Sequence, residues 1–242
     1  ADSAGLDALV KRISDSALRD RAARLGASKP DGDWASIVSA ALNPLKGRPF
    51  EEIKAALEAR RAGVVFTAHP TFALSRPMRD ALGALASGEA ADIAPLQHAP
   101  EATISLADEH ADAGAAILRA QEALRALCAA LFDWLAANVD GPWWSIRPAP
   151  LLLSTWVGYD LDGRTDIHWA QTIRFRLEEK ARQLAHYAEA LGQVSAGALA
   201  DCFARAGKET EAQAALFAGD LDDPDRIVAA ANRLTAPGKD RY

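Results

Sequence analysis

The chain has few of the residues that mark disulfide-rich or metal-clamped proteins. Its 242 residues include only two cysteines, Cys128 and Cys202, and neither stands in paired or metal-ligand spacing. Both fall inside helical patterns, which favours a reduced, cytoplasmic compartment. No signal peptide pattern opens the sequence, and the longest apolar run is far below the roughly 18 residues of a membrane-spanning helix. We therefore expect a cytoplasmic protein with no membrane partner.

Positive charge is also in short supply. The 27 lysines and arginines are outnumbered by 33 aspartates and glutamates, which gives a formal net charge of −6. Nucleic-acid binding depends on basic surfaces that neutralise phosphates, so we expect no nucleic-acid partner. The local cluster of Arg19, Arg21 and Arg24 fits a solvated helix face. Half of the residues are hydrophobic, however, which is enough for a sizeable core.

Most of the sequence predicts helix, because apolar residues recur at three- and four-residue steps. The first helix covers about 5–27, with an apolar stripe of Leu6, Leu9, Val10, Ile13 and Leu18. The other predicted helices cover 33–42, a segment beginning near Pro49, and about 75–86, 103–139, 165–191, 196–218 and 224–234. Ser75 and Thr165 are the predicted N-caps of two of them.

The start of the longest predicted helix is acidic. Asp108, Glu109, His110 and Asp112 lie within one and a half turns, and Asp108 and Asp112 share a helix face. These residue types allow a metal site. The alternative, which we favour, is a solvated first turn, because acidic residues stabilise the positive end of a helix dipole.

Two apolar runs break the helical pattern and end at polar residues. The first leads from Gly63 into His69, where Pro70 biases the histidine toward extended backbone and so ends the strand. The second leads from Leu151 to Asp160 and Asp162. Both runs have the composition of strands buried on two faces, as parallel strands covered by helices are.

These runs predict two adjacent parallel strands, Val64–Ala68 and Leu151–Val157, joined by a long helical crossover. Because parallel strands present their carboxyl ends at one edge, we expect His69 to lie near Asp160. An imidazole there suits proton transfer near neutral pH, although a hydrogen bond that caps the strand is the alternative.

Aspartates two residues apart at a strand end point the same way. Asp160 and Asp162 are therefore candidates for orienting a cationic side chain or a water molecule, while the alternative is an ordinary turn of D-x-D-G composition. Arg76, at the start of the helix after the first strand, is a further candidate for substrate binding or for supporting the site.

The two motifs resemble segments of phosphoenolpyruvate carboxylase. Thr67 to Thr71 matches the beginning of a T-A-H-P-T-E strand, and Gly158 to Gly163 is similar to the beginning of a G-G-D-R-D-G-N-P segment. The motifs occur in the same order, and His69 and Asp160 are 160 − 69 = 91 residues apart, close to the family's spacing.

The resemblance implies a mainly helical fold around the first strands of a β/α barrel, with residues 1–242 as a single domain in the N-terminal part of a longer enzyme. It implies carboxylation of phosphoenolpyruvate by bicarbonate, giving oxaloacetate and phosphate, with Mg²⁺ or Mn²⁺. His69 matches the family's catalytic histidine. The metal ligands, the essential lysine and most phosphate-binding arginines fall outside the matched part, so no metal ligand is assigned here. Homo-oligomer formation stays open.

The motifs also depart from the family pattern. Phe72 replaces a glutamate, Tyr159 a glycine and Leu161 an arginine, while Arg164-Thr165 replaces Asn-Pro. Losing a glutamate and an arginine together removes a potential ion pair from a site that binds an anion. Two classes of function follow: the N-terminal part of a divergent phosphoenolpyruvate carboxylase, or a non-catalytic helical module of the same ancestry that serves assembly or regulation.

Overall fold

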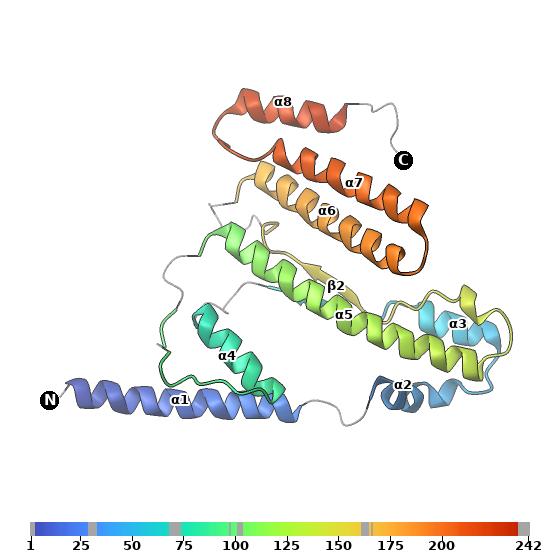
Figure 1. Cartoon of the computed structure of the whole chain (residues 1–242), viewed down its shortest axis with the longest axis horizontal. Helices are drawn as coiled ribbons and strands as arrows, with labels where there is room; N and C mark the ends of the chain where they lie inside the picture. The colour runs from blue at the N-terminus through green and yellow to red at the C-terminus, as the bar shows by residue number, and fades with distance from the viewer. Residues whose placement is uncertain are drawn as a thin grey trace. The chain divides into compact units, whose positions relative to one another are not determined.

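The computed structural model describes residues 3–28, 33–67, 74–96, 98–100, 104–160, 165 and 167–236. This part of the chain is mainly helical and contains two short parallel strands (Figure 1). The predicted class, mainly helical with two short parallel strands, is confirmed. None of the described helices has the length and apolarity needed to cross a membrane.

The predicted helices are all present, with ends that differ by a few residues. In chain order the elements are α1 (Ser3–Ala27), α2 (Trp34–Leu42), the short 3-10 helix η1 (Asn43–Leu45), α3 (Phe50–Glu58), β1 (Gly63–Phe66), α4 (Arg76–Ser87), α5 (Leu106–Asn138), the 3-10 helix η3 (Trp143–Ser145), β2 (Leu152–Thr155), α6 (Trp169–Gln193), α7 (Gly197–Ala215) and α8 (Pro224–Thr235).

The observed N-caps agree with those predicted from the sequence at some helices and differ at others. Asp33 accepts a hydrogen bond from the Ser36 amide at 2.8 Å and so caps α2. Ser75 occupies the N-cap position of α4 without a side-chain cap. The prediction of Thr165 as the cap of α6 is wrong: the cap is His168, whose Nδ1 accepts from the Ala170 amide at 3.1 Å. A neutral imidazole has the acceptor that an N-cap needs.

The chain forms two compact units that we describe separately. The first contains residues 1–105 and 115–155, and the second contains residues 106–114 and 156–242. The start of α5 therefore belongs to the second unit and the rest of α5 to the first. The expectation of a single domain stays a prediction.

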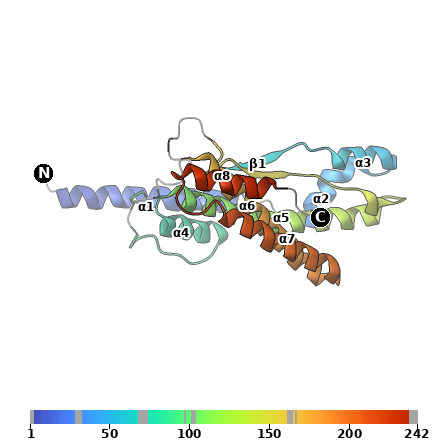
Figure 2. The same ribbon diagram turned by 90° about the horizontal axis from the view of Figure 1, so that it is seen from above.

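The first unit buries two separate hydrophobic clusters. One holds α4 against the C-terminal half of α1 (Figure 2) and consists of Ala22, Met78, Leu82 and Ile93. The other joins α2, α3 and the C-terminal half of α5, and consists of Val38, Ile53, Leu131, Trp134, Leu135, Val139 and Ile146. Each cluster closes around the apolar stripe of a helix, as three- and four-residue spacing predicts.

Helix α1 carries apolar residues on two opposite faces. Leu18 and Ala22 pack in the α4 cluster, whereas the predicted stripe of Leu6, Leu9, Val10 and Ile13 is exposed. Ile13 and Ala22 are nine residues apart, which at about 100° per residue places them half a turn from one another. This exposed part of the predicted apolar stripe is therefore not on the packed face of the helix, because in the described structure the packing partner α4 lies against the face with Leu18 and Ala22.

The two strands pair in parallel, as the sequence predicts. Gly63 lies opposite Leu152, and Phe66 lies opposite Thr155 at the carboxyl end of the pair. The Thr155 hydroxyl also donates to the Phe66 carbonyl oxygen at 2.8 Å, which ties the two ends together. The predicted continuation of the first strand to Ala68 lies outside the described residues.

The prediction that both strands are buried on two faces is wrong. Val64, Val65 and Leu152 are 40%, 53% and 49% exposed. Burial of a parallel pair requires helices on both of its faces. Within the described residues the sheet has only these two strands and leaves apolar side chains exposed.

We predict that Leu135→Ala lowers the free energy of unfolding of the first unit by about 2–5 kcal/mol, because Leu135 is fully buried among Ile53, Trp134 and Ile146 and its loss leaves a cavity. Urea denaturation followed by tryptophan fluorescence measures the change. The matched control is Leu6→Ala on the exposed face of α1, expected within about 0.5 kcal/mol of the parent. Equal effects of the two substitutions would contradict the assignment of the core.

Candidate functional site

The predicted site residues are described only in part. His69 and Asp162 lie outside the described residues, as do Phe72 and Leu161. Arg76 is the exposed first residue of α4 in the first unit. Asp160 is exposed and belongs to the second unit, where it ends a turn that follows β2. Proximity of His69 to Asp160 stays a prediction.

The described part of the second motif is a tight turn. The Tyr159 amide donates to the Trp156 carbonyl oxygen at 2.9 Å, which closes the turn. Val157 and Gly158 inside it are buried, whereas Trp156 and Asp160 at its two ends are exposed. The turn therefore presents Asp160 from a buried base.

Gly158 allows this turn to lie directly on α6. Its φ of +85° is in the left-handed region, and a Cβ at this position would lie 2.4 Å from Cδ2 of Phe175. Only glycine combines this backbone angle with so close an approach. Thr172 fixes the same residue from the side, because its hydroxyl donates to the Gly158 carbonyl oxygen at 2.8 Å.

Tyr159 is anchored to the same helix. The guanidinium carbon of Arg176 lies 4.7 Å from the centre of the tyrosine ring, which is the geometry of a cation–π contact. The phenolic oxygen is buried and has no hydrogen-bonding partner in good geometry, but it lies near enough to the Glu179 carboxylate for that group to act on its pKa. Tyr159, which stands where the phosphoenolpyruvate carboxylase motif has a glycine, thus packs against α6.

The contacts with the turn come from one stripe of α6, which we call the turn-facing stripe: Thr172, Phe175, Arg176 and Glu179. Their spacing of three, one and three residues places them on one helix face. A different face of α6, with Ala170, Ile173 and Leu177, packs in the hydrophobic cluster of Phe217, Ile227 and Ala230 from the α7–α8 region. Sequence analysis identified the apolar face and missed the turn-facing stripe, although its three- and four-residue spacing is visible in the sequence.

His110, from the start of α5, completes the group. Its Nε2 lies 3.0 Å from Oε1 of Glu179, and its ring stacks on Phe175 with centroids 4.1 Å apart and planes at 8°. The histidine is only 3% exposed and the neighbouring Glu109 only 8%. The expectation of a solvated first turn is therefore wrong for these two residues, because they face the second unit's interior.

The metal-site alternative for this segment gains no support. Within the described residues there is no group of three or more histidine, cysteine, aspartate or glutamate side chains placed to hold a metal ion. The Glu179 carboxylate instead accepts from the His110 imidazole and the Arg176 guanidinium, and it lies close to the Tyr159 phenol.

Charges within the cluster shift two pKa values in opposite directions. Burial of the Glu179 carboxyl raises its pKa, but the hydrogen bond to His110 and the nearby Tyr159 hydroxyl, with the charges of His110 and Arg176, lower it below the ordinary value of 4.5 overall. Burial, followed by the Glu179 carboxylate, raises the pKa of the Tyr159 phenol far above its ordinary value. At neutral pH the cluster therefore holds an ionised Glu179 and a protonated Tyr159.

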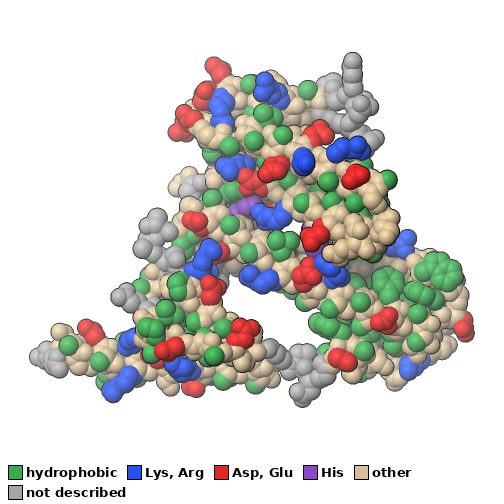
Figure 3. All heavy atoms as spheres, in the orientation of Figure 1, with side chains coloured by type: hydrophobic (Ala, Val, Ile, Leu, Met, Phe, Trp, Pro, Cys, Tyr) green, Lys and Arg blue, Asp and Glu red, His purple; other side chains and the backbone are tan. Residues whose placement is uncertain are grey.

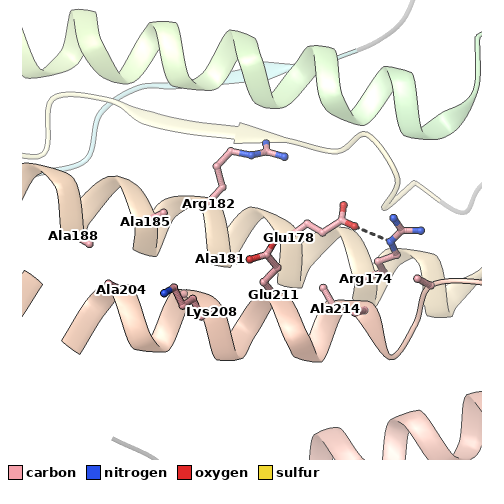
Figure 4. A pocket seen from close by; sticks show the side chains of 13 residues that line it. Arg174, Glu178, Ala181, Arg182, Ala185, Ala188, Ala204, Lys208, Glu211 and Ala214 are labelled. Atoms are coloured by element: carbon pink, nitrogen blue, oxygen red, sulfur yellow. Dashed lines mark hydrogen bonds and ion pairs between the residues drawn. The ribbon is translucent and has the colours of Figure 1, made fainter. Parts of the chain in front are cut away.

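The second unit has a groove between α6 and α7. It encloses about 740 Å³ and is lined mainly by alanines of the two helices (Figure 4). Arg174 and Glu178 on its rim pair with each other at 2.7 Å. Charges of both signs are likewise interspersed over the face shown in Figure 3. The groove has no convergent polar groups of one kind, so we do not assign it as the site.

We predict that Gly158→Ala destabilises the protein more than Gly88→Ala does. Both glycines have a φ of +85°, but a Cβ at Gly88 would meet nothing within 4 Å. Gly88→Ala thus carries only the backbone cost of about 1–2 kcal/mol, and Gly158→Ala adds overpacking against Phe175 of about 1–3 kcal/mol. Thermal and urea unfolding measure both variants. Equal losses would show that the turn does not press on α6.

We predict that ionised Glu179 stabilises the fold and that acid removes this contribution. Its folded-state pKa is below 4.5, so the stabilisation is fully present above about pH 4.5, its ordinary value, and is lost as the pH falls through the lower folded value. The free-energy difference between the parent and Glu179→Gln should therefore narrow as urea denaturation is repeated from pH 7 down to about pH 3. A difference that stays constant over this range would contradict the shift.

Comparison of the chain with known protein families, with curated proteins and with solved structures gives no match to any of them.

Proposed function

We propose that this chain is the N-terminal part of a divergent phosphoenolpyruvate carboxylase, which joins phosphoenolpyruvate to bicarbonate and yields oxaloacetate and phosphate. The observation that carries the proposal is the parallel pairing of β1 with β2. Phe66 and Thr155 lie opposite one another, so the chain leaves both strands at the same end of the pair, and each resembling motif continues from that end.

In this proposal His69 is the catalytic residue and accepts or donates a proton at the reacting group. Asp160 and Asp162 orient a cationic side chain or a water molecule, and Arg76 supports substrate binding. Mg²⁺ or Mn²⁺ serves the complete enzyme, but no group of metal ligands occurs among the described residues, so none is assigned to this chain. A cytoplasmic location belongs to the same proposal.

The departure at Tyr159 has a structural explanation that is compatible with a working site. The tyrosine ring lies under Arg176, and its hydroxyl is buried near Glu179. The side chain therefore points into the protein rather than over the exposed Asp160. We infer that this substitution changes how the turn is anchored and leaves Asp160 exposed at the end of the turn.

A non-catalytic assembly or regulatory module is the second candidate. The exposed apolar stripe of α1 and the exposed apolar residues of β1 and β2 favour it, because contiguous apolar surface marks places where proteins associate. Phe72 and Leu161, which replace charged residues of the family motifs, favour it as well.

A coupled assay separates the two candidates. The natural polypeptide that contains this sequence is incubated with phosphoenolpyruvate, bicarbonate and Mg²⁺, and oxaloacetate is measured through NADH oxidation by malate dehydrogenase. The proposal requires oxaloacetate that depends on all three additions. The isolated 242-residue chain is expected to be inactive and serves as the control. No product from the natural polypeptide would favour the non-catalytic module.

We predict that His69→Asn lowers kcat of the natural polypeptide by about 10²–10⁴ while its melting temperature changes little, because a proton-transfer group is lost and the side-chain size is nearly kept. His186→Asn, on α6, is the matched control and should keep turnover. If His69→Asn keeps full turnover, His69 has the strand-capping role instead.

We predict that Phe72→Glu combined with Leu161→Arg raises phosphoenolpyruvate-dependent turnover if these two positions silence the site. An apolar pair can replace an ion pair without loss of stability, but it removes charges that an anionic substrate requires nearby. Phe72→Gln with Leu161→Gln, which adds polarity without charge, is the control. Full activity of the unchanged protein would show that these departures do not limit the reaction.

A further inference from the structure

We infer that Glu179 is a positioning residue for the second motif: from α6 it joins His110 to the Tyr159 turn and thereby fixes the backbone that presents Asp160. The inference rests on the proposed function only in treating Asp160 as a site residue. The positioning itself follows from contacts within the second unit.

Both oxygens of the Glu179 carboxylate are engaged. Oε1 lies 3.0 Å from Nε2 of His110, and Oε2 lies 3.3 Å from a guanidinium nitrogen of Arg176. The same guanidinium covers the Tyr159 ring. The His110 side chain is 4% exposed and that of Glu179 is 21% exposed, so solvent can replace little of the bond between these two, whereas the Arg176 side chain is 70% exposed. One carboxylate thus connects α5, α6 and the turn.

The turn is held at Gly158 and Tyr159, the two residues that precede Asp160. The Gly158 carbonyl accepts from Thr172, the Gly158 backbone rests on Phe175, and the Tyr159 side chain is held by the turn-facing stripe. Because each peptide unit is planar, only the φ and ψ angles of Tyr159 separate these anchors from the Asp160 amide. Fixing Tyr159 therefore restricts the direction in which Asp160 leaves the turn.

The turn-facing stripe of α6 makes hydrogen bonds and ring contacts, unlike the apolar face of the same helix. Its other face packs with apolar side chains such as Ile173 and Leu177, which hold helices together without fixing a direction. Hydrogen bonds and stacked rings are directional, and a buried network of them specifies one arrangement. The Thr172 and Glu179 hydrogen bonds and the Phe175 ring contact all lie on the face of α6 that carries the motif turn, which is what positioning requires.

Amide hydrogen exchange of the full chain tests the inference. In Glu179→Gln the His110 and Tyr159 contacts weaken, and we expect the amide of Tyr159, which closes the turn, to exchange on the order of tenfold faster than in the parent. The matched control is Glu178→Gln, one position earlier on the same helix, where the carboxylate pairs with Arg174. The control should leave exchange in the turn unchanged.

A spectroscopic signature separates positioning from a general loss of stability. Titration of tyrosinate absorbance in the parent, minus the same titration in Tyr159→Phe, isolates the Tyr159 phenol. Its pKa is raised partly by the Glu179 carboxylate, so it should fall in Glu179→Gln. Glu178 raises the pKa of the Tyr159 phenol less than Glu179 does, and Arg176 lowers it. Glu178→Gln should therefore change this pKa less than Glu179→Gln.

The exchange and titration measurements test the positioning role of Glu179 separately from the proposed enzyme activity. Equal exchange in the two glutamine variants, or an unmoved Tyr159 pKa, overturns it. If Glu179→Gln does not fold, His110→Phe carries the test, because it keeps a ring on Phe175 but loses the bond to Glu179, and unchanged exchange in the turn of that variant overturns the inference. None of these measurements needs substrate. Faster exchange in a protein that makes no oxaloacetate would uphold the positioning and reject the proposed function, whereas an active protein with unchanged exchange would do the reverse.

Discussion

The close approach of Gly158 to Phe175 is the contact on which the second unit depends. Without a Cβ, the chain after β2 lies flat on α6, and the neighbouring Tyr159 comes within the influence of Glu179. Glu179 then reaches His110, whose ring covers the other part of Phe175. A larger residue at position 158 would lift the turn and separate these partners, so one missing methyl group sets the geometry of four side chains.

Helix α6 meets two different demands on its two faces. Its apolar face must exclude water, and the small and aliphatic residues against Phe217 and Ile227 do so. Its turn-facing stripe buries polar groups, which is unfavourable unless each finds a partner. Glu179 meets this condition through His110 and Arg176. The Tyr159 hydroxyl, without a partner in good geometry, is the place where the condition is met least well.

Local sequence patterns predicted the helices and the parallel strands because periodicity, turn residues and β-branched runs act over a few neighbouring residues. They did not predict what covers each face. The stripe of Leu6 and Ile13 has the right spacing for burial but lacks a partner here, and His110 looked solvated because Glu179, its partner, is 69 residues away. The turn-facing stripe was not predicted for the same reason, since its packing depends on Gly158, which lies outside the helix.

The strand pair also has a consequence for how the protein is made. Phe66 and Thr155 are 89 residues apart, so β1 leaves the ribosome long before β2 exists to pair with it. At the usual rate of synthesis, about 5–20 residues per second, this interval is roughly 4–18 s. During that time the unpaired edges of Val64 and Val65 are open to other chains. Helices α1 to α4 are therefore synthesised before β1 has a strand to pair with.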